Sequence, residues 1–65
     1  MAEPPEGLRK LRHDLANPLA ALLTETQLLL LNEAHLDPET ARGLHEIQAL
    51  ARRMRDILAA ARDSR

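Results

Sequence analysis

Apolar residues in the first half of the chain recur every three or four positions, and this spacing predicts an amphipathic helix over about residues 6–32. The predicted stripe consists of Leu8, Leu11, Leu15, Leu19, Leu22, Thr26 and Leu29 or Leu30. Residues 19–31 contain more leucines than one narrow stripe can hold, so two faces of this helix need to be covered. Residues 1–5, which are acidic and rich in proline, are expected to form a disordered lead-in.

The second half of the chain predicts another helix over about residues 38–62, followed by a short tail at residues 63–65. Its start is marked at residues 37–39 by an acidic N-cap, a proline in the first helical position and a second acid. Its apolar stripe alternates steps of four and three residues: Thr40, Leu44, Ile47, Ala51, Met54, Leu58 and Ala61. The connection of about five residues makes the helices antiparallel neighbours, so residues 6–62 are expected to form one helical hairpin.

The composition supports an all-α fold that is completed by association. The chain has no aromatic residue and no valine, yet 45% of it is hydrophobic, which is typical of a helical bundle and not of a sheet. A domain of 65 residues rarely gains more than about 3–5 kcal/mol from its own core, and this chain has no cysteine with which to form a disulfide. The expected fold is therefore an antiparallel two-helix hairpin that forms a homodimeric four-helix bundle.

The charge distribution argues against a nucleic-acid or membrane partner. Nine basic and ten acidic side chains give a formal net charge of −1 and are spread along the chain. A local basic cluster, Arg52, Arg53 and Arg55, is interpreted as the solvated face of a helix. The longest apolar run, residues 28–31, is far shorter than the roughly 20 residues that span a bilayer, and the acidic start is unlike a signal peptide. The expected location is the cytoplasm.

A polar cluster, His-Asp-Leu-Ala-Asn-Pro at residues 13–18, lies inside the first predicted helix. Pro18 has no N–H to donate to the carbonyl of Asp14, so a kink is expected here. When the leucine stripe faces a partner helix, His13 lies on the opposite, water-facing side, with Asn17 one turn further on and Asp14 on the flank. An exposed histidine is largely neutral at cytoplasmic pH and can act as a nucleophile. Phosphoryl transfer requires little more than positioning, access and countercharge.

Other chemistry finds little support in the sequence. His45 begins a string like the zinc-protease signature but has no second histidine, and no Glu-x-x-His motif occurs for a di-metal bundle. His35 and His45 are therefore interpreted as ordinary solvated residues. No glycine-rich phosphate loop is present, so the chain is expected to bind neither a metal nor ATP.

The polar cluster at residues 13–18 resembles the phosphoacceptor box of sensor histidine kinases, whose pattern is His-acid-x-x-Asn/Thr-Pro. Residues 53–58, Arg-Met-Arg-Asp-Ile-Leu, are similar to the end of the second helix in the dimerisation and phosphotransfer domain of that family. The two matches frame almost the whole chain. The box differs from the commonest pattern at Ala16, where an arginine is usual, and at Arg12, where a small polar residue often precedes the histidine.

The resemblance implies that His13 accepts the γ-phosphoryl group of ATP and passes it to an aspartate of a response-regulator receiver domain. Asp14 would then act as a base or orient the imidazole, and Asn17 would position water when the partner is dephosphorylated. The ATP-binding kinase domain, with its Mg²⁺, would act in trans or lie outside this chain, which is therefore only part of a histidine kinase phosphorelay. In the expected hairpin His13 lies near Asp56 and Ile57.

Two other interpretations remain open. The first is a non-catalytic dimerisation or scaffold hairpin with a vestigial phosphoacceptor box, which the departures at Arg12 and Ala16 favour. The second is a hairpin that associates with nucleic acid, which the absence of net positive charge disfavours. In the phosphoacceptor interpretation, Arg53 lies one turn from the facing residues and is expected to be close to an incoming phosphate.

Overall fold

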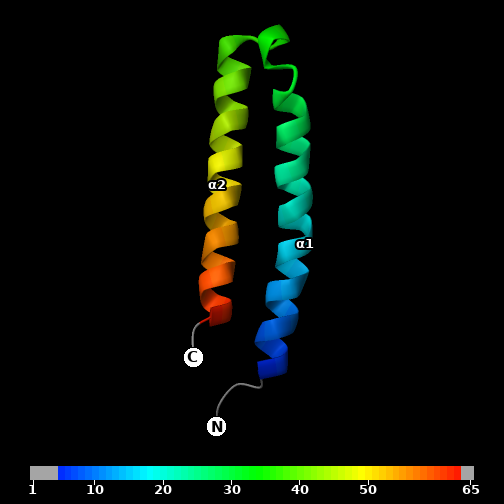
Figure 1. Cartoon of the computed structure of the whole chain (residues 1–65), viewed down its shortest axis with the longest axis vertical. Coiled ribbons are helices and arrows are strands. Elements are labelled where there is room, and N and C mark those ends of the chain that lie inside the picture. The colour runs from blue at the N-terminus through cyan, green and yellow to red at the C-terminus, as the bar shows by residue number, and fades with distance from the viewer. Residues whose placement is uncertain (1–4, 64–65) are drawn as a thin grey trace.

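The computed structural model describes residues 5–63, with side chains for residues 7–61. It contains helix α1 (Pro5–Leu30), a short 3₁₀ helix η1 (Glu33–His35) and helix α2 (Pro38–Asp63). Figure 1 shows α1 and α2 lying antiparallel along their length, with η1 in the turn at one end and the start of α1 and the end of α2 at the other. All regular structure within these residues is helical, which confirms the prediction of an all-α hairpin.

Helix α1 ends at Leu30, two residues before the predicted end. The amide of Leu31 bonds to the carbonyls of both Gln27 and Leu28, at 3.1 and 3.3 Å, and the next amide bonds only three residues back. The last turn therefore tightens from α-helical to 3₁₀ geometry, which is common where a helix ends. Most of the predicted lead-in, residues 1–4, lies outside the described residues.

Helix α2 begins at Pro38, where the sequence places its start. The carboxylate of Asp37 accepts a hydrogen bond from the amide of Thr40 at 3.1 Å and another from the hydroxyl of Thr40. These bonds satisfy an amide that has no partner within the helix, which is the function of an N-cap. The helix continues to Asp63, and residues 64–65 of the predicted tail lie outside the part that the structure describes.

Each predicted apolar stripe divides into two rows with different surroundings. Leu19 and Thr26 of α1 and Ala51 of α2 are buried between the helices. Leu44 and Leu58 of α2 are half-buried. Other positions of the stripes are exposed in the hairpin: Leu8, Leu11, Leu15, Leu22, Leu29, Thr40, Ile47, Met54 and Ala61. The facing helix thus covers only one of two apolar rows, which agrees with the expectation that a single hairpin leaves apolar surface for association.

The core within the hairpin is small. Among the described side chains, only three hydrophobic residues, Leu19, Ala41 and Ala51, are buried, while eleven large hydrophobic residues remain exposed. Two polar side chains, Thr26 and Gln48, are also buried, and the hydroxyl of Thr26 donates to the carbonyl of Leu23 at 3.0 Å. So much exposed apolar surface marks an interaction face. Neither α1 nor α2 is apolar enough over a sufficient length to cross a membrane.

Candidate functional site

The polar cluster at residues 13–18 lies in the N-terminal half of α1, which continues through Pro18 without interruption. Because proline has no N–H, the carbonyl of Asp14 has no helical partner at this turn. Figure 1 shows the blue N-terminal part of α1 inclined relative to its green C-terminal part. Pro18 therefore changes the direction of the helix near the cluster while leaving the helix itself intact.

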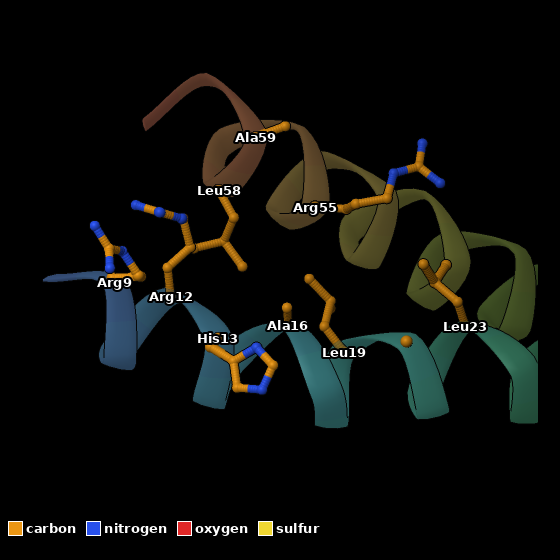
Figure 2. A pocket seen from close by; sticks show the side chains of 10 residues that line it. Arg9, Arg12, His13, Ala16, Leu19, Leu23, Arg55, Leu58 and Ala59 are labelled. Carbon is orange, nitrogen blue, oxygen red and sulfur yellow. The ribbon is translucent and has the colours of Figure 1, made fainter. Parts of the chain in front are cut away.

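His13, Asp14 and Asn17 are all exposed on α1. His13 faces solvent, as the heptad pattern predicts, and lies at the edge of a groove between the two helices (Figure 2). Within residues 7–61, no hydrogen bond joins His13 to Asp14 or to Asn17. The helix thus brings the three polar side chains close together but leaves the imidazole open to an incoming group.

The carboxylate of Asp14 is bound to a different neighbour. Lys10, one turn earlier, donates a hydrogen bond from Nζ to Oδ2 of Asp14 at 2.9 Å, and both side chains are exposed. The spacing of four residues is the usual one for such pairs on a helix surface. Asp14 must leave this exposed pair if it is to hold the imidazole of His13.

The groove beside His13 has a volume of about 560 Å³ and a mixed lining. Its apolar side includes Leu19, Leu23 and Leu58, and its charged residues are arginines: Arg9, Arg12 and Arg55. Arg9 and Arg12 come from α1 and Arg55 comes from α2 (Figure 2). No aspartate or glutamate is among the described residues that line the groove. The site is therefore a cationic groove with an apolar wall.

The facing residues on α2 differ in detail from the expected ones. Arg55, Leu58 and Ala59 share the groove with His13, whereas Asp56 and Ile57 were expected beside it. Arg53, expected near an incoming phosphate, is not among the residues that line the groove. The register is close to the predicted one, but the rotation of α2 about its axis directs Arg55 to this side. That rotation depends on helix packing, which spacing alone does not determine.

A second groove, with a volume of about 270 Å³, is apolar throughout. It is lined by Leu15, Leu19, Leu22, Met54, Ile57, Leu58 and Pro18. Five of these residues are exposed and lie on or beside the predicted apolar stripes: Leu15, Pro18, Leu22, Met54 and Ile57. The second groove therefore lies on the apolar face that remains uncovered in the single hairpin.

The remaining histidines lie near the turn. Nε2 of His45 is 3.1 Å from Oε1 of Glu33, an exposed contact that links η1 to α2 across the turn. No sequence pattern predicts this pair, because its partners are twelve residues apart. In the described part of the chain, no group of three His, Cys, Asp or Glu side chains could hold a metal ion.

Comparison with protein families identifies the hairpin. The model of the His Kinase A (phospho-acceptor) domain matches residues 7–64, which is nearly the whole chain. The chain belongs to this family. The resemblance of the sequence to sensor histidine kinases is thereby confirmed. Searches among curated proteins and among solved structures gave no match.

Membership in the His Kinase A family defines the general role of the hairpin. It is a phosphoacceptor and dimerisation module of the histidine kinases, which act in two-component signalling. The geometry agrees with both aspects, because one side of the hairpin exposes a histidine beside cationic side chains and another exposes an apolar groove.

Proposed function

We propose that His13 is the residue that accepts the phosphoryl group and relays it to an aspartate of a response-regulator receiver domain. The observation that carries this proposal is the exposed imidazole at the edge of a groove whose charged residues are all arginines. A neutral imidazole nitrogen attacks the γ-phosphorus of ATP, the N–P bond forms, and the bond to the leaving ADP oxygen breaks. Access from solvent and countercharge are the two requirements that this site supplies.

Asp14 and Asn17 divide the supporting chemistry in this proposal. Asp14, once released from Lys10, holds the proton of one ring nitrogen of His13, which keeps the lone pair of the other nitrogen directed at the donor. Asn17, one turn further along α1, orients a water molecule toward a phosphoaspartate on a docked receiver domain. Asp14 thus supports phosphorylation of His13, and Asn17 supports dephosphorylation of the receiver domain.

ATP and Mg²⁺ belong to a separate kinase domain in this proposal. The chain has only two glycines, so its sequence contains no glycine-rich phosphate loop. The kinase domain presents the nucleotide to the groove beside His13, either in trans or from elsewhere in a longer protein. We place the reaction in the cytoplasm, where ATP and receiver domains are available.

The active assembly in this proposal is a homodimer. The apolar groove between Leu22 of α1 and Met54 of α2 is open, and these side chains are 43% and 52% exposed. A second hairpin related by a two-fold axis would cover the same groove on both copies and form a four-helix bundle. His13 lies outside this groove and remains accessible in such a dimer.

The receiver domain is expected to dock on α1 beyond the histidine. The candidate residues are exposed and lie between Pro18 and the turn: Ala20, Ala21, Thr24, Gln27 and Leu28. The small side chains of Ala20 and Ala21 allow another helix to approach closely. Replacing either by tryptophan should slow transfer to the receiver while the dimer persists. Unchanged transfer kinetics would place the docking surface elsewhere.

The relay is tested in two steps with radiolabelled ATP. A cognate kinase domain first labels the hairpin, and the labelled hairpin is then mixed with a receiver domain. The expected label is acid-labile and base-stable on the hairpin, moves to the receiver, and is absent from a His13→Gln variant. Label that persists on His13→Gln, or no label with several cognate partners, would support the alternative of a scaffold hairpin with a vestigial box.

A further inference from the structure

Two arginines of α1 lie within one turn of His13. Arg9 precedes the histidine by four residues and therefore lies on the same face of the helix. Arg12 precedes it directly and is half-buried where it enters the groove. Figure 2 shows the guanidinium groups of Arg9 and Arg12 at the same end of the groove, while Arg55 extends toward the other end. Arg9, Arg12 and His13 thus line the same end of the groove.

None of the ion pairs formed by the side chains of residues 7–61 involves these two arginines. Asp14, which follows Arg12 by two residues, is bound to Lys10 at 2.9 Å. Arg55 differs, because its Nη2 lies 3.4 Å from Oδ1 of Asp56. Like charges three residues apart on a helix repel each other weakly, so this arrangement slightly opposes folding. An anion placed between the two guanidinium groups would remove that repulsion.

We propose that Arg9 and Arg12 form an anion-binding cradle that holds the non-bridging oxygens of the phosphoryl group on His13. The proposal rests on the proposed function for the identity of the anion. Arg9 and His13 are four residues apart, so their Cβ atoms are roughly 5–6 Å apart, which is well within the reach of arginine, whereas the adjacent Arg12 must reach the phosphoryl group from the flank of the helix. A guanidinium group presents a planar set of donors that matches phosphate oxygens in pairs. Arg9 and Arg12 are therefore anion-binding residues, separate from the roles of Asp14 and Asn17.

Arg9 and Arg12 act on the phosphoryl group while it is transferred to His13. When a nucleoside triphosphate is the donor, the N–P bond to the imidazole forms and the bond between the γ-phosphorus and the bridging oxygen breaks. The nucleoside diphosphate leaves with that electron pair, and the proton on the other ring nitrogen is released to Asp14 or to water. The charge on the transferred group resides on its three outer oxygens throughout, so fixed guanidinium groups stabilise both the transfer and the product.

The test uses phosphoramidate, a small phosphoryl donor that phosphorylates imidazoles and releases ammonia without a protein partner. His35 is an internal reference, because it is exposed in η1 and does not line the groove. We expect His13 to be phosphorylated faster than His35, and to lose the group more slowly, by roughly three- to tenfold. No kinase or receiver domain takes part, so the relay and the cradle can fail independently of each other.

Charge variants then assign the effect to the two arginines. Arg9→Gln with Arg12→Gln should abolish the preference for His13, whereas Arg9→Lys with Arg12→Lys should retain part of it, and added salt should weaken it. Arg42→Gln is the matched control, because Arg42 is exposed on α2 and does not line the groove. Arg9→Gln alone changes an exposed position and should leave the fold intact. It should reduce the ratio of the His13 and His35 phosphorylation rates by half or more. Equal labelling of His13 and His35, or a preference that survives both glutamine substitutions, would overturn the proposal.

Discussion

At the level of single residues, the proposed relay makes the reactivity of His13 depend on which neighbour the adjacent carboxylate of Asp14 binds. In the structure Asp14 is paired with Lys10 at 2.9 Å, and both side chains are more than half exposed. An exposed pair at this spacing on a helix is worth only about 0.3–0.5 kcal/mol. The carboxylate can therefore move from Lys10 to the imidazole at little cost when a donor approaches.

This competition predicts opposite effects for two substitutions. Asp14→Asn should slow phosphorylation of His13 by roughly tenfold or more, because the proton on the ring loses its acceptor. Lys10→Met should speed it by about twofold, because the carboxylate is released from its present partner. The rate of label incorporation from a kinase domain measures both effects, with Asn17→Ala as a control that leaves this rate unchanged. If Asp14→Asn labels at the parent rate, Asp14 has no part in the forward reaction.

At the level of the helices, the N-cap of α2 is the best-defined local feature. Hydrogen bonds from the hydroxyl and the amide of Thr40 lower the pKa of Asp37 below its ordinary value of 3.8. A carboxylate with a lowered pKa in the folded state adds stability that is fully present above 3.8. That stability is lost as the pH falls through the lowered pKa. The cap thus stabilises α2 at neutral pH and less so in acid.

Removing the cap should reproduce this pH dependence. Asp37→Ala is expected to lower the melting temperature at neutral pH. This difference in melting temperature between variant and parent should become smaller as the pH falls below 3.8. Asp37→Asn is the control, because an amide still caps the helix but does not titrate over this range. Thermal melts followed by circular dichroism measure the difference. A difference that is the same at neutral and acidic pH would show that the charge of Asp37 contributes nothing.

The positions of both helices were largely predicted from the sequence, and individual residues explain why. The start of α2 follows from Asp37 and Pro38, whose chemistry suits those two positions alone. The end of α1 was placed two residues late, because Leu31 carries no signal that stops a helix. The need to cover two apolar faces was predicted, but the sequence did not show which stripe positions lie inside the hairpin, because both rows consist mainly of aliphatic residues. Polar residues between the helices, such as Gln48, were missed because polarity suggests exposure.

The site was predicted in part. The exposure of His13 followed from its place opposite the leucine stripe, and the spacing of Lys10 and Asp14 permits their pair on any helix. The cationic groove was not foreseen, because it needs Arg55 of α2 to turn toward α1. Contacts across the hairpin depend on how each helix is rotated about its axis, and one-dimensional spacing does not define that rotation.

At the level of the whole molecule, the hairpin leaves an apolar face that a second copy can cover. Leu15, Leu22, Met54 and Ile57 line this face and are all exposed. The core of the single hairpin contains only one large aliphatic side chain that is buried among the described residues, Leu19. A domain this small rarely gains more than about 3–5 kcal/mol from its own core, and the chain has no cysteine with which to form a disulfide.

Charge placed on this face should therefore separate the copies. Met54→Glu, or Leu22→Glu, should lower both the dimer content and the helicity, because each would bury a charge in the bundle. Leu31→Glu is the matched control, since Leu31 is 77% exposed and does not line the apolar groove. Sedimentation equilibrium at micromolar concentration should give twice the chain mass for the parent and for the control. A folded monomer in the parent protein would contradict the four-helix bundle.

The central claim, that His13 is the phosphoacceptor, is tested most directly by locating the phosphoryl group. The chain has three histidines, so the protein can be phosphorylated by a cognate kinase domain with ATP and then fragmented under alkaline conditions for mass spectrometry. The fragment with His13 should carry the phosphoryl group, and the fragments with His35 and His45 should not. A phosphoryl group on His35 or His45, with His13 unmodified, would contradict it.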